Sequence, residues 1–117
     1  DEVAADRKLV TTINGKETAQ FMFFNGLSRT KKQGNIDYLE NPYISDNLSF
    51  SFQMQVLCNE YYPGLTRRIY LKGYRYNMHV RPKTLLIEMG AQTNTVEEAM
   101  NACNPLAQML DMCLRGK

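Results

Sequence analysis

The fold class is decided by residues 85–94, which read Leu-Leu-Ile-Glu-Met-Gly-Ala-Gln-Thr-Asn. A short apolar run that ends at a glycine and a polar loop is typical of a buried strand in an α/β sheet. Glu88 is the one ionisable residue of that run. A carboxylate is tolerated near the C-terminal end of such a strand, where open α/β sheets place their binding crevice. The sequence therefore predicts an α/β fold with Glu88 at a cleft, although a glutamate that caps a turn or pairs with an arginine gives the same pattern.

A β-hairpin is predicted upstream of this strand. Asn14 and Gly15 separate two strand-like segments, residues 7–13 and 17–24. Asn-Gly favours the left-handed conformations of a type I′ turn, which joins neighbouring antiparallel strands. We expect both strands to join the same sheet, and we expect residues 25–43, rich in Gly, Asn and Lys, to form a long loop.

Residues 46–60 are compatible with two structures. Apolar side chains alternate with polar ones from Leu48 to Val56, as in a half-buried strand. Ser45 or Asp46 as N-cap, and the spacing of Leu48, Phe52 and Val56, favour a helix instead. On these residues alone both alternatives stay open.

The remaining elements are two strands and a helix. Residues 68–72 and 84–89 are predicted strands, joined by a tyrosine-rich stretch that begins at Gly73. Asn94 or Thr95 is expected to cap a final helix that runs to about residue 115, with acidic residues in its first turn. Pro105 lies inside that helix, so a kink or break near 102–104 is expected.

Composition bounds the function only broadly. The 117 residues are 44% hydrophobic, which is enough for the core of one domain. The formal charge of +2 gives no electrostatic case for a nucleic-acid partner. No stretch approaches the ~18–20 apolar residues of a membrane span, and none resembles a signal peptide. The three cysteines lack Cys-x-x-Cys spacing and are expected to be buried free thiols on helices.

A family resemblance adds to these observations. Residues 86–99, Leu-Ile-Glu-Met-Gly-Ala-Gln-Thr-Asn-Thr-Val-Glu-Glu-Ala, resemble the closing motif of the zinc N-acetylmuramoyl-L-alanine amidases. The version with Gly-Ala-Gln-Thr-Asn is most similar to that of the stage II sporulation protein P family. Weaker matches lie at residues 19–23, 62–67 and 74–83.

The resemblance implies a fold and an activity. The fold would be a mostly parallel mixed sheet flanked by helices, with a helix at 46–60. Residues 1–117 would be the C-terminal portion of a single amidase catalytic domain, and such an incomplete domain would leave an apolar patch uncovered. The activity would be hydrolysis of the amide between muramic acid and L-alanine in peptidoglycan during sporulation engulfment. The implied location is extracytoplasmic, at the cell wall or septum, with any membrane anchor outside this chain. Implied partners are peptidoglycan and other engulfment proteins.

The resemblance also implies site residues. Glu88 matches the family's proton-shuttling glutamate. The family's zinc is held by two His and one Glu, but this chain has one histidine, His79, without a second His or Cys at zinc-like spacing. We therefore expect the zinc ligands upstream of this chain and assign no metal ligand within it.

Three residues near the predicted cleft are candidates for substrate binding. A guanidinium group suits a carboxylate, so Arg75 and Asn77 are candidates for a glycan or stem-peptide carboxylate, with a solvated strand edge as the alternative. Gln92 either orients substrate or builds the turn, and Asn94 is expected to be a cap. A peptidoglycan-binding module without catalysis is the alternative function, since this chain lacks a full ligand set.

Overall fold

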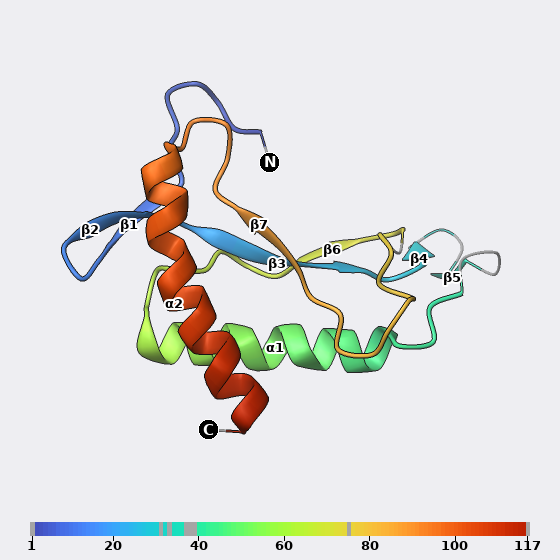
Figure 1. Cartoon of the computed structure of the whole chain (residues 1–117). Coiled ribbons are helices and arrows are strands. Elements are labelled where there is room, and N and C mark those ends of the chain that lie inside the picture. The colour runs from blue at the N-terminus through green and yellow to red at the C-terminus, as the bar shows by residue number, and fades with distance from the viewer. Residues whose placement is uncertain (1, 31, 33, 37–39, 75, 117) are drawn as a thin grey trace.

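The computed structural model describes residues 2–30, 32, 34–36, 40–74 and 76–116. The chain forms an α/β fold, as the sequence predicts (Figure 1). Its elements are β1 (Val10–Ile13), β2 (Lys16–Ala19), β3 (Phe21–Gly26), β4 (Arg29–Thr30), β5 (Gly34–Asn35), α1 (Ile44–Tyr61), β6 (Tyr70–Lys72), β7 (Leu86–Met89) and α2 (Val96–Arg115).

The predicted hairpin is present, but both of its strands are shorter than expected, since the first begins at Val10 and not at residue 7. Asn14 and Gly15 have φ values of 51° and 78°, as a type I′ turn requires, and β1 pairs antiparallel with β2. The expected strand 17–24 divides at Gln20 into β2 and β3. In the described part of the chain, β1 and β2 form a sheet of their own, so only β3 joins β7.

The sheet that holds Glu88 is mixed. Within the described residues its strand order is β6-β3-β7, with β3 parallel to β6 and antiparallel to β7. An isolated parallel bridge between Phe21 and Thr66 extends the pairing on the β6 side. β7 was expected inside a mostly parallel sheet but lies at an edge among the strands that the structure describes, and its residues are half-buried. The central strand is β3, whose six residues are all buried.

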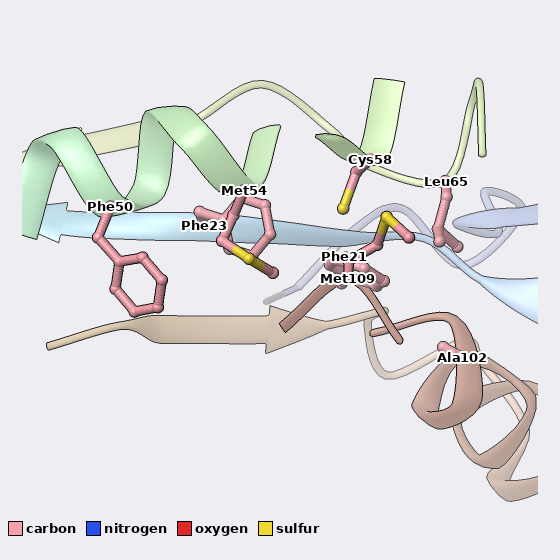
Figure 2. Packing of buried hydrophobic residues seen from close by; sticks show 8 residues of the cluster. All are labelled: Phe21, Phe23, Phe50, Met54, Cys58, Leu65, Ala102 and Met109. Atoms are coloured by element: carbon pink, nitrogen blue, oxygen red, sulfur yellow. The ribbon is translucent and has the colours of Figure 1, made fainter. Parts of the chain in front are cut away.

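The core lies between one face of this sheet and the two described helices. Phe21 and Phe23 on β3 meet edge-to-face at 5.7 Å between ring centroids. Figure 2 shows them between side chains of α1 and α2, including Met54 and Met109. Ile87 and Met89 of β7 pack against the same cluster. Figure 1 shows α1 lying along this side of the sheet, near α2, and the two helices are in contact.

Residues 46–60 are helical, but the buried face of the helix differs from the expected one. α1 begins at Ile44 after Tyr43, so neither Ser45 nor Asp46 caps it. Its buried residues are Asn47, Phe50, Ser51, Met54 and Cys58. Phe52 and Val56, expected to face the core, are 62% and 55% exposed. The polar members of the buried face are satisfied, because Ser51 exchanges hydrogen bonds with Asn25 at 2.9 and 3.2 Å.

α2 begins as the sequence predicts. Thr95 is the N-cap and forms a capping box with Glu98. The helix continues through Pro105, so the expected break is absent from this described segment. In the part of residues 25–43 that the structure describes, β4 pairs with β5 in a short antiparallel ladder. Neither described helix combines the length and apolar character that a membrane crossing requires.

Candidate functional site

Glu88 lies on the face of the sheet opposite the core. In the antiparallel pair of β3 and β7, Met22 is the partner of Glu88 and Phe24 is the partner of Leu86. Side chains of directly paired residues share a face and alternate along each strand. Because Phe21 and Phe23 face the core, Met22, Phe24 and Glu88 face the other way. We call this second face the open face, since a cavity lies against it.

The cavity on the open face has a volume of about 650 Å³. Glu88, Met22 and Phe24 line it from the sheet. The side chains with formal charge are three basic and two acidic ones: Arg7, Arg67, Lys72, Glu2 and Glu88. The other lining residues are Val3, Ala4, Tyr70 and Tyr76. A polar, slightly cationic cavity beside a carboxylate suits a polar ligand with acidic groups more than a hydrocarbon ligand.

Aromatic side chains form the β6 side of this cavity. Phe24 is 5% exposed and meets Tyr70 at 5.4 Å and Tyr76 at 4.8 Å between ring centroids. The two tyrosines are 42% and 46% exposed. The buried phenylalanine therefore supports two rings that solvent, or a ligand, can reach.

Lys72 stands next to this aromatic group. Its Nζ lies 4.9 Å from the ring centroid of Tyr70, within the range of a cation–π contact. Side-chain hydrogen bonding with Tyr70 raises the pKa of the Lys72 ammonium above its ordinary value. Lys72 is cationic at neutral pH, as an unperturbed lysine also is.

The N-terminal segment forms another wall of the cavity and is held in place by the loop after β7. The backbone N–H of Val3 donates to Oε1 of Gln92 at 2.9 Å, and the Gln92 amide nitrogen donates back to the Val3 carbonyl. Further along, Lys8 pairs with Glu98 at 2.6 Å and the Leu9 carbonyl accepts from Asn94 at 2.8 Å. Glu2, Val3 and Arg7 thus line the cavity because residues 92–98 fix their segment.

The segment after β6 is anchored to α1. Asn47 donates to the Met78 carbonyl at 2.6 Å and accepts from the Thr84 backbone N–H at 2.8 Å. Met78 is 1% exposed, and its sulfur accepts from the Gly26 backbone N–H at 3.1 Å. Tyr76 has φ +50°, which is uncommon for a residue other than glycine. These anchors hold Tyr76 against Phe24 despite that conformation.

The predicted site residues lie in different places. Glu88 lines the cavity. Gln92 is next to it but uses both ends of its amide to hold Val3. Asn77 is exposed in the turn that follows Tyr76 and does not line the cavity. Arg75 lies outside the described residues.

Sequence reasoning missed the residues across the sheet from Glu88. Tyr70 and Lys72 are two positions apart on one strand, so they share a face, and Arg67 precedes that strand. The spacing was visible in the sequence. These side chains line the cavity because Tyr70 pairs with Phe24 on β3, and spacing along the sequence does not predict this tertiary pairing.

The described residues do not fit a zinc site. Among residues 2–30, 32, 34–36, 40–74 and 76–116, no three His, Cys, Asp or Glu side chains come together as a metal would require. Nδ1 of His79 is buried without a hydrogen-bond partner in this part of the chain, but a single nitrogen cannot replace three ligands.

Comparisons with known proteins agree with the family resemblance. The model of the stage II sporulation protein P family matches residues 1–111. The chain is 29% identical over 103 residues to stage II sporulation protein P of Bacillus subtilis (strain 168). That alignment covers 84% of this chain and 23% of the relative, so the chain spans about a quarter of the relative's length. No solved structure matches. Since the family model covers nearly the whole chain, the chain belongs to the stage II sporulation protein P family of sporulation proteins.

Proposed function

We propose that this chain supplies the acid–base glutamate and part of the substrate cleft of a peptidoglycan amidase that acts during engulfment. The bond cleaved would be the amide between the lactyl group of N-acetylmuramic acid and L-alanine. The observation that carries the proposal is the position of Glu88, in the motif that resembles the amidases, on the wall of a polar cavity. Membership of the sporulation family supports the biological setting.

The position of Glu88 suits proton transfer. Its backbone is fixed by the β3–β7 ladder, and the next residues are fixed by the hydrogen bond from the Gly90 N–H to the Gln20 carbonyl at 2.8 Å. The carboxylate is half-buried and reaches a cavity that can admit substrate. In amide hydrolysis it would take a proton from the attacking water and return it to the leaving amine, which leaves a lactyl carboxylate and a free L-alanine amino group.

The zinc of the proposed enzyme would be held outside this chain. Catalytic zinc takes three protein ligands and the described residues bring no such group together. The matched relative is about four times as long as the aligned segment, which leaves room for ligands elsewhere in the protein. We also propose that the full-length protein acts at the septum and that any membrane anchor lies outside residues 1–117.

The test is Glu88→Gln in the full-length protein, assayed on purified cell walls. General acid–base groups contribute about 10²–10⁴-fold to the rate. The rate at which new N-terminal L-alanine is released should therefore fall at least about 100-fold. Glu60→Gln is the matched control, because Glu60 is exposed on α1, on the far side of the sheet. The control should cleave at the wild-type rate.

Two outcomes would count against the assignment. Near-normal release of N-terminal L-alanine by Glu88→Gln would show that Glu88 is not the acid–base residue. Release of new reducing sugar ends, without new amino termini, would show that the protein cleaves glycan strands and not the amide.

A binding module without catalysis is the second candidate. The observation that favours it is the aromatic and cationic wall formed by Tyr70, Tyr76 and Lys72, which needs no metal to bind a polar ligand. Two results together would establish this candidate. The full-length wild-type protein would bind to purified walls, and prolonged incubation with zinc would produce neither new amino termini nor new reducing ends.

A further inference from the structure

The cavity has two chemically different sides, and they lie on opposite sides of β3. Glu88 is on β7, whereas Tyr70 and Lys72 are on β6, and β3 separates the two strands. Adjacent strands are about 4.8 Å apart, so the two sides are separated by about 10 Å across the sheet. A ligand that contacts both sides must therefore be larger than one sugar ring or one amino acid.

The β6 side has a surface suited to a sugar ring. Tyr70 and Tyr76 are each about half exposed and rest on the buried ring of Phe24. Because the support is buried, the two exposed rings lose little freedom when a ligand packs on them. Rings with an apolar face and polar edges, such as pyranoses, can bury the C–H face on the aromatic surface and leave the hydroxyl groups in water.

The same side carries a positive charge. Lys72 Nζ is 4.9 Å from the Tyr70 ring centroid, so a group that packs on Tyr70 comes close to the ammonium. Since both Tyr70 and Lys72 stand on one short strand paired with β3, the backbone places their side chains on the same face of the sheet. Because the ammonium lies over the Tyr70 ring, a ligand that packs on this ring must displace it, and an anionic substituent on the ligand would compensate by pairing with the displaced ammonium.

We propose that the β6 side of the cavity binds a pyranose ring on Tyr70 and Tyr76 and pairs Lys72 with a carboxylate carried next to that ring. The proposal rests on the proposed function for its substrate, because muramoyl glycopeptides have this chemistry. Two sources can supply the carboxylate: an acidic residue of the stem peptide, or the lactyl group itself once the peptide has been removed.

The experiment measures binding and not turnover. Calorimetry is carried out on the full-length protein in a Glu88→Gln background, with three probes. They are N-acetylglucosaminyl-N-acetylmuramoyl tripeptide, the same disaccharide without peptide, and the neutral dimer of N-acetylglucosamine. Lys72→Gln removes the charge, Lys72→Arg restores it, and Tyr70→Leu removes the ring. Matched controls are Lys16→Gln and Tyr61→Leu, which change exposed residues that do not line the cavity.

Lys72→Gln should weaken binding of at least one carboxylate-bearing probe about fivefold to tenfold, with recovery in Lys72→Arg. Added salt should weaken binding to the parent more than binding to Lys72→Gln, a difference that a purely structural lysine would not produce. Tyr70→Leu should weaken all three probes. If Lys72→Gln weakens only the tripeptide probe, the carboxylate belongs to the stem peptide. If it weakens the disaccharide without peptide, the carboxylate is that of the lactyl group.

Equal affinity of parent and Lys72→Gln for every probe, or no binding of any probe, would overturn the proposal. These results are separable from failure of the proposed function, because amide cleavage is assayed on walls with the wild-type protein. Binding that depends on Lys72 in a protein that cleaves nothing would retain this inference and reject the amidase.

Discussion

Gly90 ends β7 at a point where a side chain would collide with Asn94. Its φ is +69°, and a Cβ atom there would lie 2.6 Å from Oδ1 of Asn94 and 3.3 Å from Cβ of Ala19. Asn94 cannot move away easily, because the same oxygen accepts from the Ala91 N–H and its nitrogen donates to the Leu9 carbonyl. The glycine of the Glu-Met-Gly motif is therefore needed for close packing as well as for its backbone conformation.

Alanine substitutions can separate these two requirements. Gly34 has nearly the same φ, +68°, but nothing within 4 Å of its Cβ position. Gly34→Ala should cost about 1 kcal/mol for the left-handed conformation alone. Gly90→Ala should cost about 2 kcal/mol more, because the loop at Asn94 must shift. Urea unfolding of both variants checks this, and equal losses would show that the contact with Asn94 is unimportant.

The cysteines are expected to differ strongly in reactivity. All three are free, but the prediction that all are buried is wrong: Cys58 is buried, Cys113 is half-buried and Cys103 is exposed. Burial raises the pKa of the Cys58 thiol to about 12, and it also raises the pKa of Cys113. Since the thiolate is the reactive form, iodoacetamide at neutral pH should label Cys103 first, Cys113 more slowly and Cys58 only after unfolding. Peptide mass spectrometry resolves the order, and rapid labelling of Cys58 in the folded protein would contradict this packing.

At the scale of the element, the first turn of α2 is capped by its own side chains and bound to the N-terminal segment. Thr95 and Glu98 form the capping box, and Glu98 also binds Lys8 and Asn94. Hydrogen bonding from Lys8, followed by the Thr95 backbone N–H, lowers the pKa of the Glu98 carboxyl. One side chain thus connects the helix to the N-terminal wall of the cavity.

A pH dependence follows from the lowered pKa. A carboxyl group whose pKa is lower in the folded state stabilises that state above its unfolded pKa, and the contribution is lost as pH falls through the folded value. Wild type should therefore exceed Glu98→Gln in unfolding free energy near pH 7, and the difference should shrink in acid. Thermal unfolding from pH 7 down to pH 3 measures it. A difference that does not change with pH would mean that the pKa of Glu98 is the same in the folded and unfolded states, which would contradict this prediction.

The sequence of neighbouring residues predicted the hairpin turn and the start of α2 correctly, but it predicted the wrong buried face for α1. Asn14-Gly15 and the Thr95 cap were recognisable because turns and caps depend on neighbouring residues. In α1 the apolar residues occur on both faces, so periodicity could not identify the buried one. That face was decided by Asn25, Met78 and Thr84, whose polar groups bind Asn47 and Ser51 from distant segments. The site was predictable only as far as Glu88, because the opposite wall depends on how β6 pairs with β3.

At the scale of the whole molecule, the surface between the helices is apolar while the open face of the sheet is polar. A groove of about 540 Å³ runs between α1 and α2, lined by residues that include Phe52, Val56 and Cys113. Leu114 nearby is 67% exposed. The resemblance implies an incomplete domain with uncovered apolar surface; the groove is apolar, and the incomplete domain stays a prediction.

Serine substitutions along α1 distinguish the groove from the core. Replacing Phe52 and Val56 together should change the unfolding free energy by only about 0.5 kcal/mol, because both are largely exposed. Met54→Ser, on the buried face of the same helix, should cost about 3 kcal/mol or more, since Met54 is 0% exposed. Denaturant titration compares them, and a large loss in the double variant would mean that the groove is covered in solution.

The pairing of Val3 with Gln92 has a consequence for synthesis of the protein. These residues are 89 positions apart, and the Leu9–Asn94 contact spans 85. Because a chain emerges from the ribosome N-terminus first, residues 2–9 are available long before the loop that must hold them. Closing so long a loop is entropically costly and slow compared with hairpin formation. The wall of the cavity that contains Glu2 and Arg7 can therefore form only after residue 94 has emerged, so this side of the cleft stays unfinished while residues 10–93 are being synthesised.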